Sequence, residues 1–366
     1  MLNNANFNRK RLRQLHRAAS ELRRGVPVIL TGDTPLLILA AETAGPDALA
    51  EFESIARVRP VLILAPTRAS AILRSPMPVG VSAMAVAVPD SLYRIEVYGA
   101  LADPMMKQPP GGALEAVAAP IFADAAISLA KIGRLLPALL AAPLPFGQTP
   151  GDDLIEVPAA DIVAYADSEV AGLRQIVSAD VPLSGAPDSR VVAFRSDGSA
   201  IEHLAIVVGR PELHESPLVR IHSECFTGDL LGSMRCDCGE QLRGAIRRMA
   251  DDGAGILLYL AQEGRGIGLV NKLRAYGLQD RGLDTMDANR VLGWEADERN
   301  FLIGATMLRL LGVKRVRLLT NNPDKLDAMI ACGIEVAGRE PHLFAPNGVN
   351  DEYLATKATR FGHMLD

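Results

Sequence analysis

The sequence predicts an α/β (α+β) protein with two domains, the second of which is built on a mixed sheet. Short β-rich runs alternate with stretches of helical periodicity along the chain, which indicates both kinds of element. The length of 366 residues is enough for two domains that each bury a core. An apolar fraction of 49% and a charged fraction of 22% are typical of a globular protein.

The first expected element is a helix that leads into a strand at residues 26–30. The basic residues at the start of the chain could also belong to a transit peptide. A helix with one solvated face accounts for them better, because the apolar residues between them recur at helical spacing. These apolar residues are Leu12, Leu15, Ala19 and Leu22.

The remainder of the first half alternates between strands and helices. Residues 61–65 read as a buried strand and residues 113–139 as a helical region. Residues 143–158 are rich in proline, glycine and acidic residues, as in a joint between domains or a surface loop.

We expect the domain boundary near residue 175, which gives domains of residues 1–175 and 176–366. Soon after this boundary, the runs 190–195 and 204–208 are both rich in β-branched and apolar residues. They predict a hairpin that turns around Asp197-Gly198.

The second half carries clear start and stop signals. Proline at a first helical position and glycine after a last one are the expected asymmetry. In order, we expect a helix whose inner face holds Leu242, Ala245, Ile246 and Met249, a strand at 255–259, a turn at 263–268, a helix through Tyr276, a helix from Asp297 to Leu311, a strand at 316–320, and a helix from Asn322-Pro323 to Gly333.

Charge and cysteine content exclude several classes of function. The net charge of −5 gives no basic stripe for nucleic acid and no membrane-seeking surface, so neither partner is expected. No apolar run approaches the roughly 20 residues of a membrane span. The low content of four cysteines fits a reducing compartment, and we expect a cytoplasmic protein.

Three of the four cysteines, Cys225, Cys236 and Cys238, are gathered in one short stretch. Three thiolates leave one position open on a tetrahedral zinc ion, which is what separates a catalytic zinc from a structural one. Disulfides are the rival explanation, although three cysteines cannot all pair and Cys236 and Cys238 are too close to bridge comfortably. Buried structural thiols are the other alternative.

Two segments suggest phosphate binding. The glycine-rich turn 263–268 lacks both common phosphate-loop patterns and could be a plain turn, but Arg265 within it suits phosphate oxygens. Residues 320–325 lie at a strand end and a helix start, where free N–H groups favour an anion and Lys325 adds charge. A plain helix cap is the alternative there.

Other polar residues permit two interpretations each. The run Asp297-Glu-Arg299 at a helix start reads as capping, and Tyr276 as packing, unless a site recruits them. The run His222-Ser-Glu224 could supply a ligand or a general base, or hold a structural histidine.

Together these residues resemble the GTP cyclohydrolase II family from about residue 190 to the C-terminus. The matching runs, in the family's order and spacing, are 220–229, 235–239, 262–265, 284–285, 297–299 and 319–323. The resemblance implies zinc ligands at Cys225, Cys236 and Cys238 and catalytic residues at Asp297, Arg299 and Tyr276. It implies nucleotide contacts at Arg220, Ile221, His222, Ser223, Glu224, Gln241, Glu263, Gly264, Arg265, Thr285, Thr320 and Lys325.

The resemblance also implies a reaction: GTP and water give formate, pyrophosphate and 2,5-diamino-6-(5-phosphoribosylamino)pyrimidin-4(3H)-one, the first committed step of riboflavin biosynthesis. It implies one Zn2+ per subunit, Mg2+ on the triphosphate and a homodimer. The family is described as using the arginine at position 299 as a nucleophile, with Asp297 as base. A guanidinium stays protonated, so we expect Arg299 to stabilise transition-state charge instead. Ala261 departs from many relatives, which carry arginine there.

Residues 16–175 faintly resemble dihydroxybutanone phosphate synthase, the usual fusion partner of this family. The metal-binding chemistry of that enzyme does not follow. Its acidic run is replaced by the nearly chargeless 33–38, and its metal-binding histidine motif by Pro120-Ile-Phe122. Hard cations need clustered oxygen ligands, so we expect this domain to be degenerate and non-catalytic.

Two alternatives remain open. A zinc nucleoside or nucleobase deaminase is suggested by His222-Ser-Glu224 upstream of paired cysteines, but that signature requires Cys-x-x-Cys rather than Cys-x-Cys. A non-catalytic GTP-binding regulatory protein would hold the nucleotide without turnover. Formate, ammonia or unchanged GTP distinguishes the three.

Overall fold

The computed structural model describes the chain except residues 1, 77, 79, 110–113, 145–152, 345–347, 350, 352–355, 357, 359, 361, 363, 365 and 366, and the side chains of residues 2–8. The chain forms two compact units. The first unit comprises Met1–Ala166 and Val270–Asp297, and the second unit comprises Asp167–Leu269 and Glu298–Asp366. The expected functional domains 1–175 and 176–366 stay a prediction. The compact units differ from these domains chiefly in one segment, because Val270–Asp297 groups with the first unit rather than with the second.

The first unit is built on a seven-stranded sheet with the order β5-β4-β3-β6-β2-β1-β7. All neighbouring strands are antiparallel except β1 and β7, which are parallel. The interior strand β2 is buried along its whole length, which explains its continuous apolar run. The strands are β1 (Val28–Thr31), β2 (Leu36–Ala40), β3 (Val61–Leu64), β4 (Met84–Ala87), β5 (Glu115–Val117), β6 (Ala138–Pro143) and β7 (Ile155–Pro158).

Helices pack on this sheet through apolar faces. The predicted face of α1 is confirmed, since Leu15 and Leu22 share a core cluster with Leu30 of β1 and with residues of α5 and α6. The helices of this unit are α1 (Leu2–Arg23), α2 (Pro46–Ala56), α3 (Pro66–Leu73), α4 (Ile95–Ala102), α5 (Ala123–Ile132), α6 (Ala159–Val163), α9 (Leu269–Gln279, all but its first residue) and α10 (Thr285–Val291).

Two expectations for the first half need correction. The helical region 113–139 is wrong as a single element, because β5, α5 and the start of β6 share it. The supposed joint 143–158 contains the end of β6 and all of β7, while residues 145–152 lie outside the described residues.

The second unit has its own seven-stranded sheet, with the order β14-β13-β11-β12-β10-β9-β8. The strands from β8 to β12 in this order are antiparallel, and β12, β11, β13 and β14 are parallel. The predicted hairpin is confirmed as β9 and β10, with Gly198 at φ 82° in its turn. The strands are β8 (Leu173–Asp180), β9 (Ser189–Ser196), β10 (Glu202–Gly209), β11 (Leu218–Ser223), β12 (Ala254–Leu260), β13 (Arg315–Leu319) and β14 (Glu335–Glu340).

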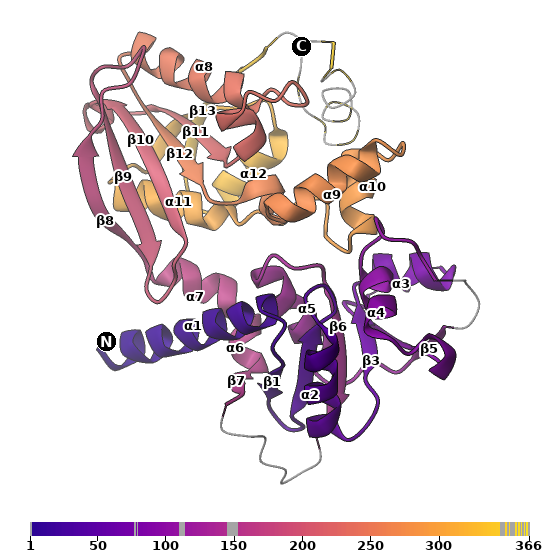
Figure 1. Ribbon diagram of the computed structural model, residues 1–366. Helices are drawn as coiled ribbons and strands as arrows, with labels where there is room; N and C mark the ends of the chain where they lie inside the picture. Colours follow the sequence, from indigo (N-terminus) through magenta and orange to yellow (C-terminus); the bar gives the residue numbers. More distant parts are fainter. Residues whose placement is uncertain are drawn as a thin grey trace. The chain divides into compact units, whose positions relative to one another are not determined.

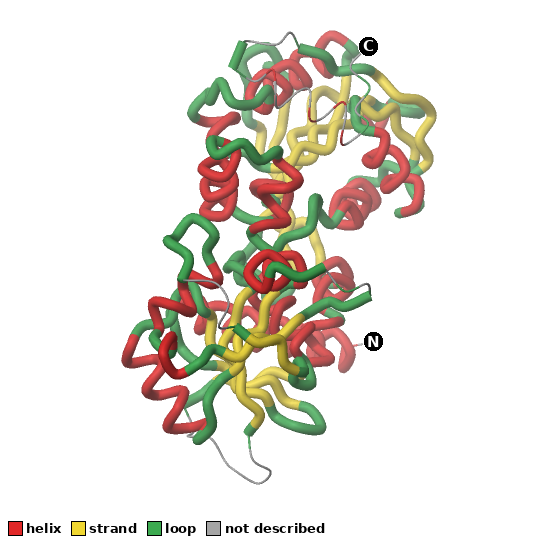
Figure 2. Tube along the Cα trace, turned by 90° about the vertical axis from the view of Figure 1, so that its right-hand side faces the viewer, coloured by secondary structure: helices red, strands yellow, loops and turns green. Residues whose placement is uncertain are grey.

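Helices cover both faces of this second sheet, and Figures 1 and 2 show them beside the strands. On one face, α8 (Cys238–Asp251) buries Ala245, Ile246 and Met249 as predicted, against β10, β11 and β12. On the other face, α11 (Phe301–Leu310) and α12 (Pro323–Ala331) form the larger core. The short helix α7 (Tyr165–Ala171) leads into this unit. None of the helices in the described part of the chain is long and apolar enough to span a membrane.

Helix caps test the predicted start and stop signals. The start of α12 is confirmed, because Asn322 Oδ1 accepts a hydrogen bond from the Asp324 amide at 2.9 Å. Gly333 at φ 80° follows the end of this helix, as expected. The helix expected to open at Asp297 instead begins at Phe301, where Asn300 Oδ1 accepts from the Leu302 amide at 3.0 Å. The capping interpretation of residues 297–299 is therefore wrong.

Candidate metal and nucleotide site

The predicted site residues of the second unit gather at one edge of its sheet. The strands β11, β12 and β13 are parallel neighbours, so their carboxyl ends lie at the same edge. The segments that leave these ends are 224–226, 261–263 and 320–322. This edge is where α/β sheets bind ligands. The topology thus brings together three stretches that are distant in sequence.

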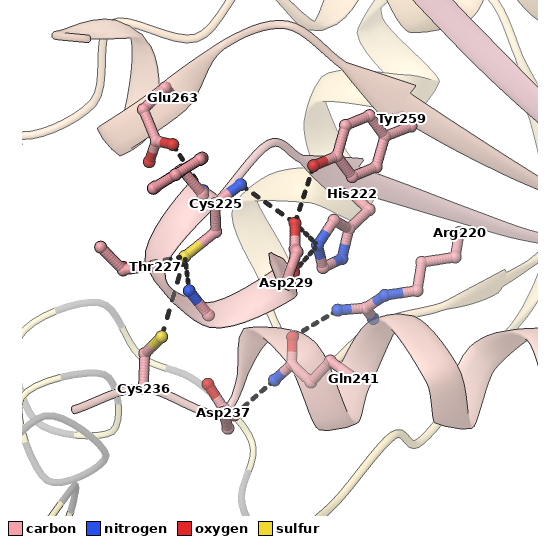
Figure 3. Close-up of polar contacts among 12 residues, drawn as sticks. Arg220, His222, Cys225, Thr227, Asp229, Cys236, Asp237, Gln241, Tyr259 and Glu263 are labelled. Carbon is pink, nitrogen blue, oxygen red and sulfur yellow. Dashed lines mark hydrogen bonds and ion pairs between the residues drawn. The ribbon is translucent and has the colours of Figure 1, made fainter. Parts of the chain in front are cut away.

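The three cysteines converge at this edge, as their spacing predicted. Cys225 follows β11, and Cys236 and Cys238 lie at the start of α8. Their sulfur atoms all lie within 4.8 Å of one another, and Cys225 Sγ is 3.8 Å from Cys236 Sγ. All three are free thiols, which removes the disulfide alternative. Figure 3 shows Cys225 and Cys236 facing each other.

This cluster fits a zinc ion. Two sulfur ligands at about 2.3 Å from a tetrahedral zinc lie about 3.8 Å apart, which is the separation found here. The backbone also leaves room, since a Cβ on Gly228 would lie 2.7 Å from Cys236 Sγ and 3.0 Å from Cys225 Sγ. The hydrogen bond with Cys225 is the main cause that raises the pKa of the Cys236 thiol to about 11. A cation and the N-terminus of α8 would both favour the thiolate instead.

Asp229 connects the first cysteine to the sheet, a role that sequence reasoning missed. Its Oδ2 accepts from the Cys225 amide at 3.0 Å and from the Tyr259 hydroxyl at 3.0 Å. His222 Nε2 lies 3.0 Å from Oδ1 of the same carboxylate. The rings of His222 and Tyr259 stack at 5.7 Å because the two residues are register partners on β11 and β12 (Figure 3).

The protonation states of His222 and Tyr259 follow from their burial. Burial lowers the pKa of His222, against the opposing effect of Asp229, so the ring is neutral at pH 7. Burial likewise raises the pKa of Tyr259, which keeps its hydroxyl as a donor to Asp229. Asp229 lies within the run 220–229 that matches the family, four residues after Cys225. This closeness in sequence is the signal that could have indicated its contact with Cys225.

Arg220 is a buried cation beneath the site. Its Nη1 donates to the Leu319 carbonyl at 3.1 Å, and its Nη2 donates to Gln241 Oε1. The Gln241 amide in turn donates to Asp237 Oδ2, so a polar chain runs from β11 to α8 (Figure 3). Burial lowers the pKa of Arg220 to about 10, with Asp237 opposing this shift. The guanidinium therefore remains charged at neutral pH.

The glycine-rich turn holds its backbone in an unusual conformation. Gly264 and Arg265 have φ of 64° and 63°, in the left-handed region that disfavours a side chain such as arginine. Glu263 Oε2 accepts from the Phe226 amide at 2.6 Å, and Oε1 accepts from the Gly264 amide at 3.0 Å. The buried Glu263 carboxylate thus joins this turn to the segment after Cys225. Arg265 itself is placed beside residue 298, whose amide donates to its carbonyl at 3.0 Å.

The third segment closes the same edge. Lys325 Nζ donates to the Ile221 carbonyl at 3.0 Å, which ties α12 to β11. Thr320 Oγ1 accepts from the Asn322 amide at 3.1 Å. His342, which sequence reasoning also missed, lies 2.8 Å through Nε2 from the Gln241 carbonyl oxygen. Burial is the main cause that lowers the pKa of His342 to about 4.

Five predicted residues need separate mention. Tyr276, Thr285 and Asp297 belong to the first unit, whereas Arg299 belongs to the second. Thr285 follows Asp284, which caps α10, and Thr285 Oγ1 accepts from Gln279 Nε2 at 2.9 Å. The Arg299 guanidinium lies 5.0 Å from the centre of the Phe301 ring. Glu224, next to the cysteine cluster, donates its amide to the Leu260 carbonyl at 2.8 Å.

Three clustered thiols beside buried cations at the carboxyl edge of parallel strands define an α/β enzyme site suited to a metal ion. The family model described as GTP cyclohydrolase II matches residues 174–341. The chain is 47% identical to a GTP cyclohydrolase-2 from Azospirillum brasilense, over 97% of this chain and 94% of that protein. The chain belongs to the GTP cyclohydrolase II family and is an enzyme of this type.

Other relatives match part of the chain. A GTP cyclohydrolase-2 from Shigella dysenteriae is 48% identical over 53% of this chain and 98% of that protein. The riboflavin biosynthesis protein RibBA from Parabacteroides distasonis is 46% identical over 56% of this chain and 50% of that protein, so the match spans half of that relative. A solved structure, the two-domain 3,4-dihydroxy-2-butanone 4-phosphate synthase RibBX from A. baumannii, covers 89% of this chain and 99% of that chain at 18% identity. Its TM-score of 0.33 is too low to assign the fold.

Proposed function

We propose that the protein hydrolyses GTP in a zinc-dependent reaction that releases formate and pyrophosphate and leaves 2,5-diamino-6-(5-phosphoribosylamino)pyrimidin-4(3H)-one, the first committed step of riboflavin biosynthesis. The observation that carries the proposal is the thiol cluster of a chain belonging to the GTP cyclohydrolase II family. Cys225, Cys236 and Cys238 would hold one Zn2+ per subunit. When bound, zinc supplies an open coordination position at which the pKa of water is lowered toward about 7.

The surrounding residues orient these ligands. Asp229 binds the Cys225 amide and is itself fixed by Tyr259, so the first ligand is held by a buried carboxylate. Such supporting contacts usually affect metal affinity by about 10–100-fold. Glu263 fixes the next residue, Phe226, through its amide. These contacts support the backbone on both sides of the first proposed ligand, Cys225.

Buried polar atoms support nucleotide binding at the same edge. Arg220 Nε, Ser223 Oγ and Gln262 Oε1 are buried and have no hydrogen-bond partner among the described residues. Leaving such an atom unpaired costs about 1–3 kcal/mol, so polar groups of a substrate are the natural partners. These atoms, with Ile221, His222, Glu224 and Gln241 nearby, would contact the nucleotide.

The triphosphate requires positive charge. We assign this role to Arg265, Lys325 and Arg299, together with Mg2+ on the phosphates. Arg299 would stabilise the transition state of phosphoanhydride cleavage electrostatically, with Asp297 as base. Tyr276 would donate a hydrogen bond to the oxygen that gains charge when water adds to C8 of the purine. Thr285, Thr320, Glu263 and Gly264 complete the proposed nucleotide contacts.

Incubation of the purified protein with GTP, Zn2+ and Mg2+, followed by mass analysis of the products, tests the proposal. We expect formate, pyrophosphate and the diaminopyrimidinone in equal amounts. Ammonia instead of formate would indicate a deaminase, and GTP bound without turnover would indicate a regulatory protein. The same preparation also tests the proposed homodimer by light scattering. The cytoplasmic location, the absence of nucleic-acid and membrane partners, and a non-catalytic domain 1–175 complete the proposal.

A further inference from the structure

Helix α9, which carries Tyr276, is held by a charged clamp within the first unit. Arg274 Nε donates to Asp103 Oδ2 at 2.9 Å, and Arg274 Nη1 lies 2.9 Å from Glu42 Oε1. Nη1 also donates to Asn271 Oδ1 at 2.8 Å. One guanidinium on the helix therefore joins two carboxylates from distant parts of residues 1–166.

Both carboxylates are oriented by the backbone through their second oxygen. Glu42 Oε2 accepts from the Leu136 amide at 2.7 Å, and Asp103 Oδ1 accepts from the Met105 amide at 2.8 Å. The side chains of Arg274, Glu42 and Asp103 are only 18%, 14% and 14% exposed. The Arg274 clamp, formed by these three side chains, is a largely desolvated charge group, and breaking it leaves a poorly solvated charge unpaired.

Close packing holds the same part of α9. Asn271 is fully buried, and its Nδ2 donates to the Arg134 carbonyl at 3.0 Å. A Cβ on Gly277 would lie 2.5 Å from Met105 Cε, so the helix packs closely against the end of the Met105 side chain. Neither these contacts nor the clamp have a part in the proposed chemistry. Their common effect is to fix the position and rotation of α9.

We propose that Arg274 is a positioning residue for ring opening. It is two positions before Tyr276 on the same helix, so the two side chains point about 200° apart around the helix axis. Fixing one side of the helix therefore fixes the direction of the tyrosine hydroxyl on the other. The two carboxylates that pair with Arg274 belong to Glu42 and Asp103, which lie in the expected non-catalytic domain. In this proposal, that domain contributes to catalysis by holding α9 in place. This inference rests on the proposed function and on the proposed role of Tyr276.

A double-mutant cycle with Arg274→Met and Tyr276→Phe tests the inference. In otherwise unaltered protein, we expect Arg274→Met to lower kcat for formate release about 10–100-fold, with KM for GTP changed less than about threefold, since a small misplacement of a reacting group costs this much. In the Tyr276→Phe background the same substitution should have almost no further effect. An equal loss in both backgrounds, or no loss in the first, would overturn the proposal.

Two further variants separate positioning from general stability. Arg11 on α1 forms an ion pair with Asp161 of α6 in the same unit, with the arginine side chain 35% exposed. Arg11→Met should lower the melting temperature but leave kcat within about twofold; a loss of kcat equal to that of Arg274→Met would refute a specific role. Asp103→Asn, which keeps the size of the side chain, replaces Arg274→Met if the latter does not fold. Zinc content should stay at the wild-type value in every variant, and a loss of zinc would also contradict the inference.

The outcome also separates this inference from the proposed function. If the wild-type protein releases no formate, the proposed function fails. If the wild-type protein releases formate and the clamp variants keep its kcat, only the positioning role fails.

Discussion

Replacing Gly228 by alanine should weaken zinc binding by the thiol cluster without unfolding the protein. The added Cβ would lie 2.7 Å from Cys236 Sγ, 2.9 Å from Cys238 Cβ and 3.0 Å from Cys225 Sγ. Favourable carbon contacts lie at about 3.5–4.0 Å, so these three atoms would be too close to the new Cβ by about 0.5–1.3 Å. Gly228 does not have a positive φ, so the expected effect is steric rather than a change in backbone preference.

The magnitude follows from the cost of overpacking, which is typically about 1–3 kcal/mol. If the strain falls on the metal-bound geometry, the zinc dissociation constant rises by about 5- to 150-fold, since about 1.4 kcal/mol corresponds to a factor of ten. Competition with a zinc chelator measures this constant directly, and formate release should fall with zinc occupancy. Excess zinc should restore part of the activity.

Gly338 on β14 supplies the matched control. A Cβ there meets no atom within 4 Å and its φ is not positive, so Gly338→Ala should keep wild-type zinc affinity. The reasoning is refuted if Gly228→Ala binds zinc as tightly as the wild type and the Gly338→Ala control do. Circular dichroism should show that both variants retain the folded state.

Three further predictions address the ligands and the buried network. Cys236→Ser should lose zinc and formate release while part of the pyrophosphate release survives, because the latter depends on Mg2+ and cations; full ring opening by this variant would exclude the zinc assignment. Asp229→Asn should raise the zinc dissociation constant by about 10–100-fold, as chelator competition would show, because it weakens the contact that holds Cys225; unchanged affinity would count against this role. His342 has a folded-state pKa lowered to about 4 by burial, below the ordinary 6.5. The unfolded state therefore binds more protons, so stability should fall as pH decreases from about 6.5 toward about 4, and urea titrations of His342→Asn should show a smaller decrease in this range.

Local signals were sufficient for elements marked at their ends. The hairpin of β9 and β10 follows from Asp197-Gly198, and α12 from Asn322-Pro323 and Gly333. The helical region 113–139 failed because alanine and leucine runs suit either a helix or a strand covered on both faces. Ala138–Pro143 is such a strand, paired on both sides with β2 and β3.

The site shows the same distinction. The spacing of Cys225, Cys236 and Cys238 was enough to predict their convergence, since the three residues lie within one short stretch of chain that can fold back on itself. The support of Cys225 by Tyr259 through Asp229 depends on the register of β11 and β12, which no local pattern encodes. The ion pair between Glu42 and Arg274 likewise joins residues that are far apart in the sequence, so no local pattern predicts it.

The interleaved connectivity of the two units has a practical consequence for anyone who dissects this protein. The chain leaves the second unit after Leu269 and returns at Glu298 before it adds β13 and β14, so no single cut releases that unit whole. A fragment of residues 176–366 would carry α9 and α10 away from their neighbours and expose Trp294, which is only 2% exposed in the intact chain. The newly exposed apolar surface should make such a fragment more prone to self-association than the intact chain.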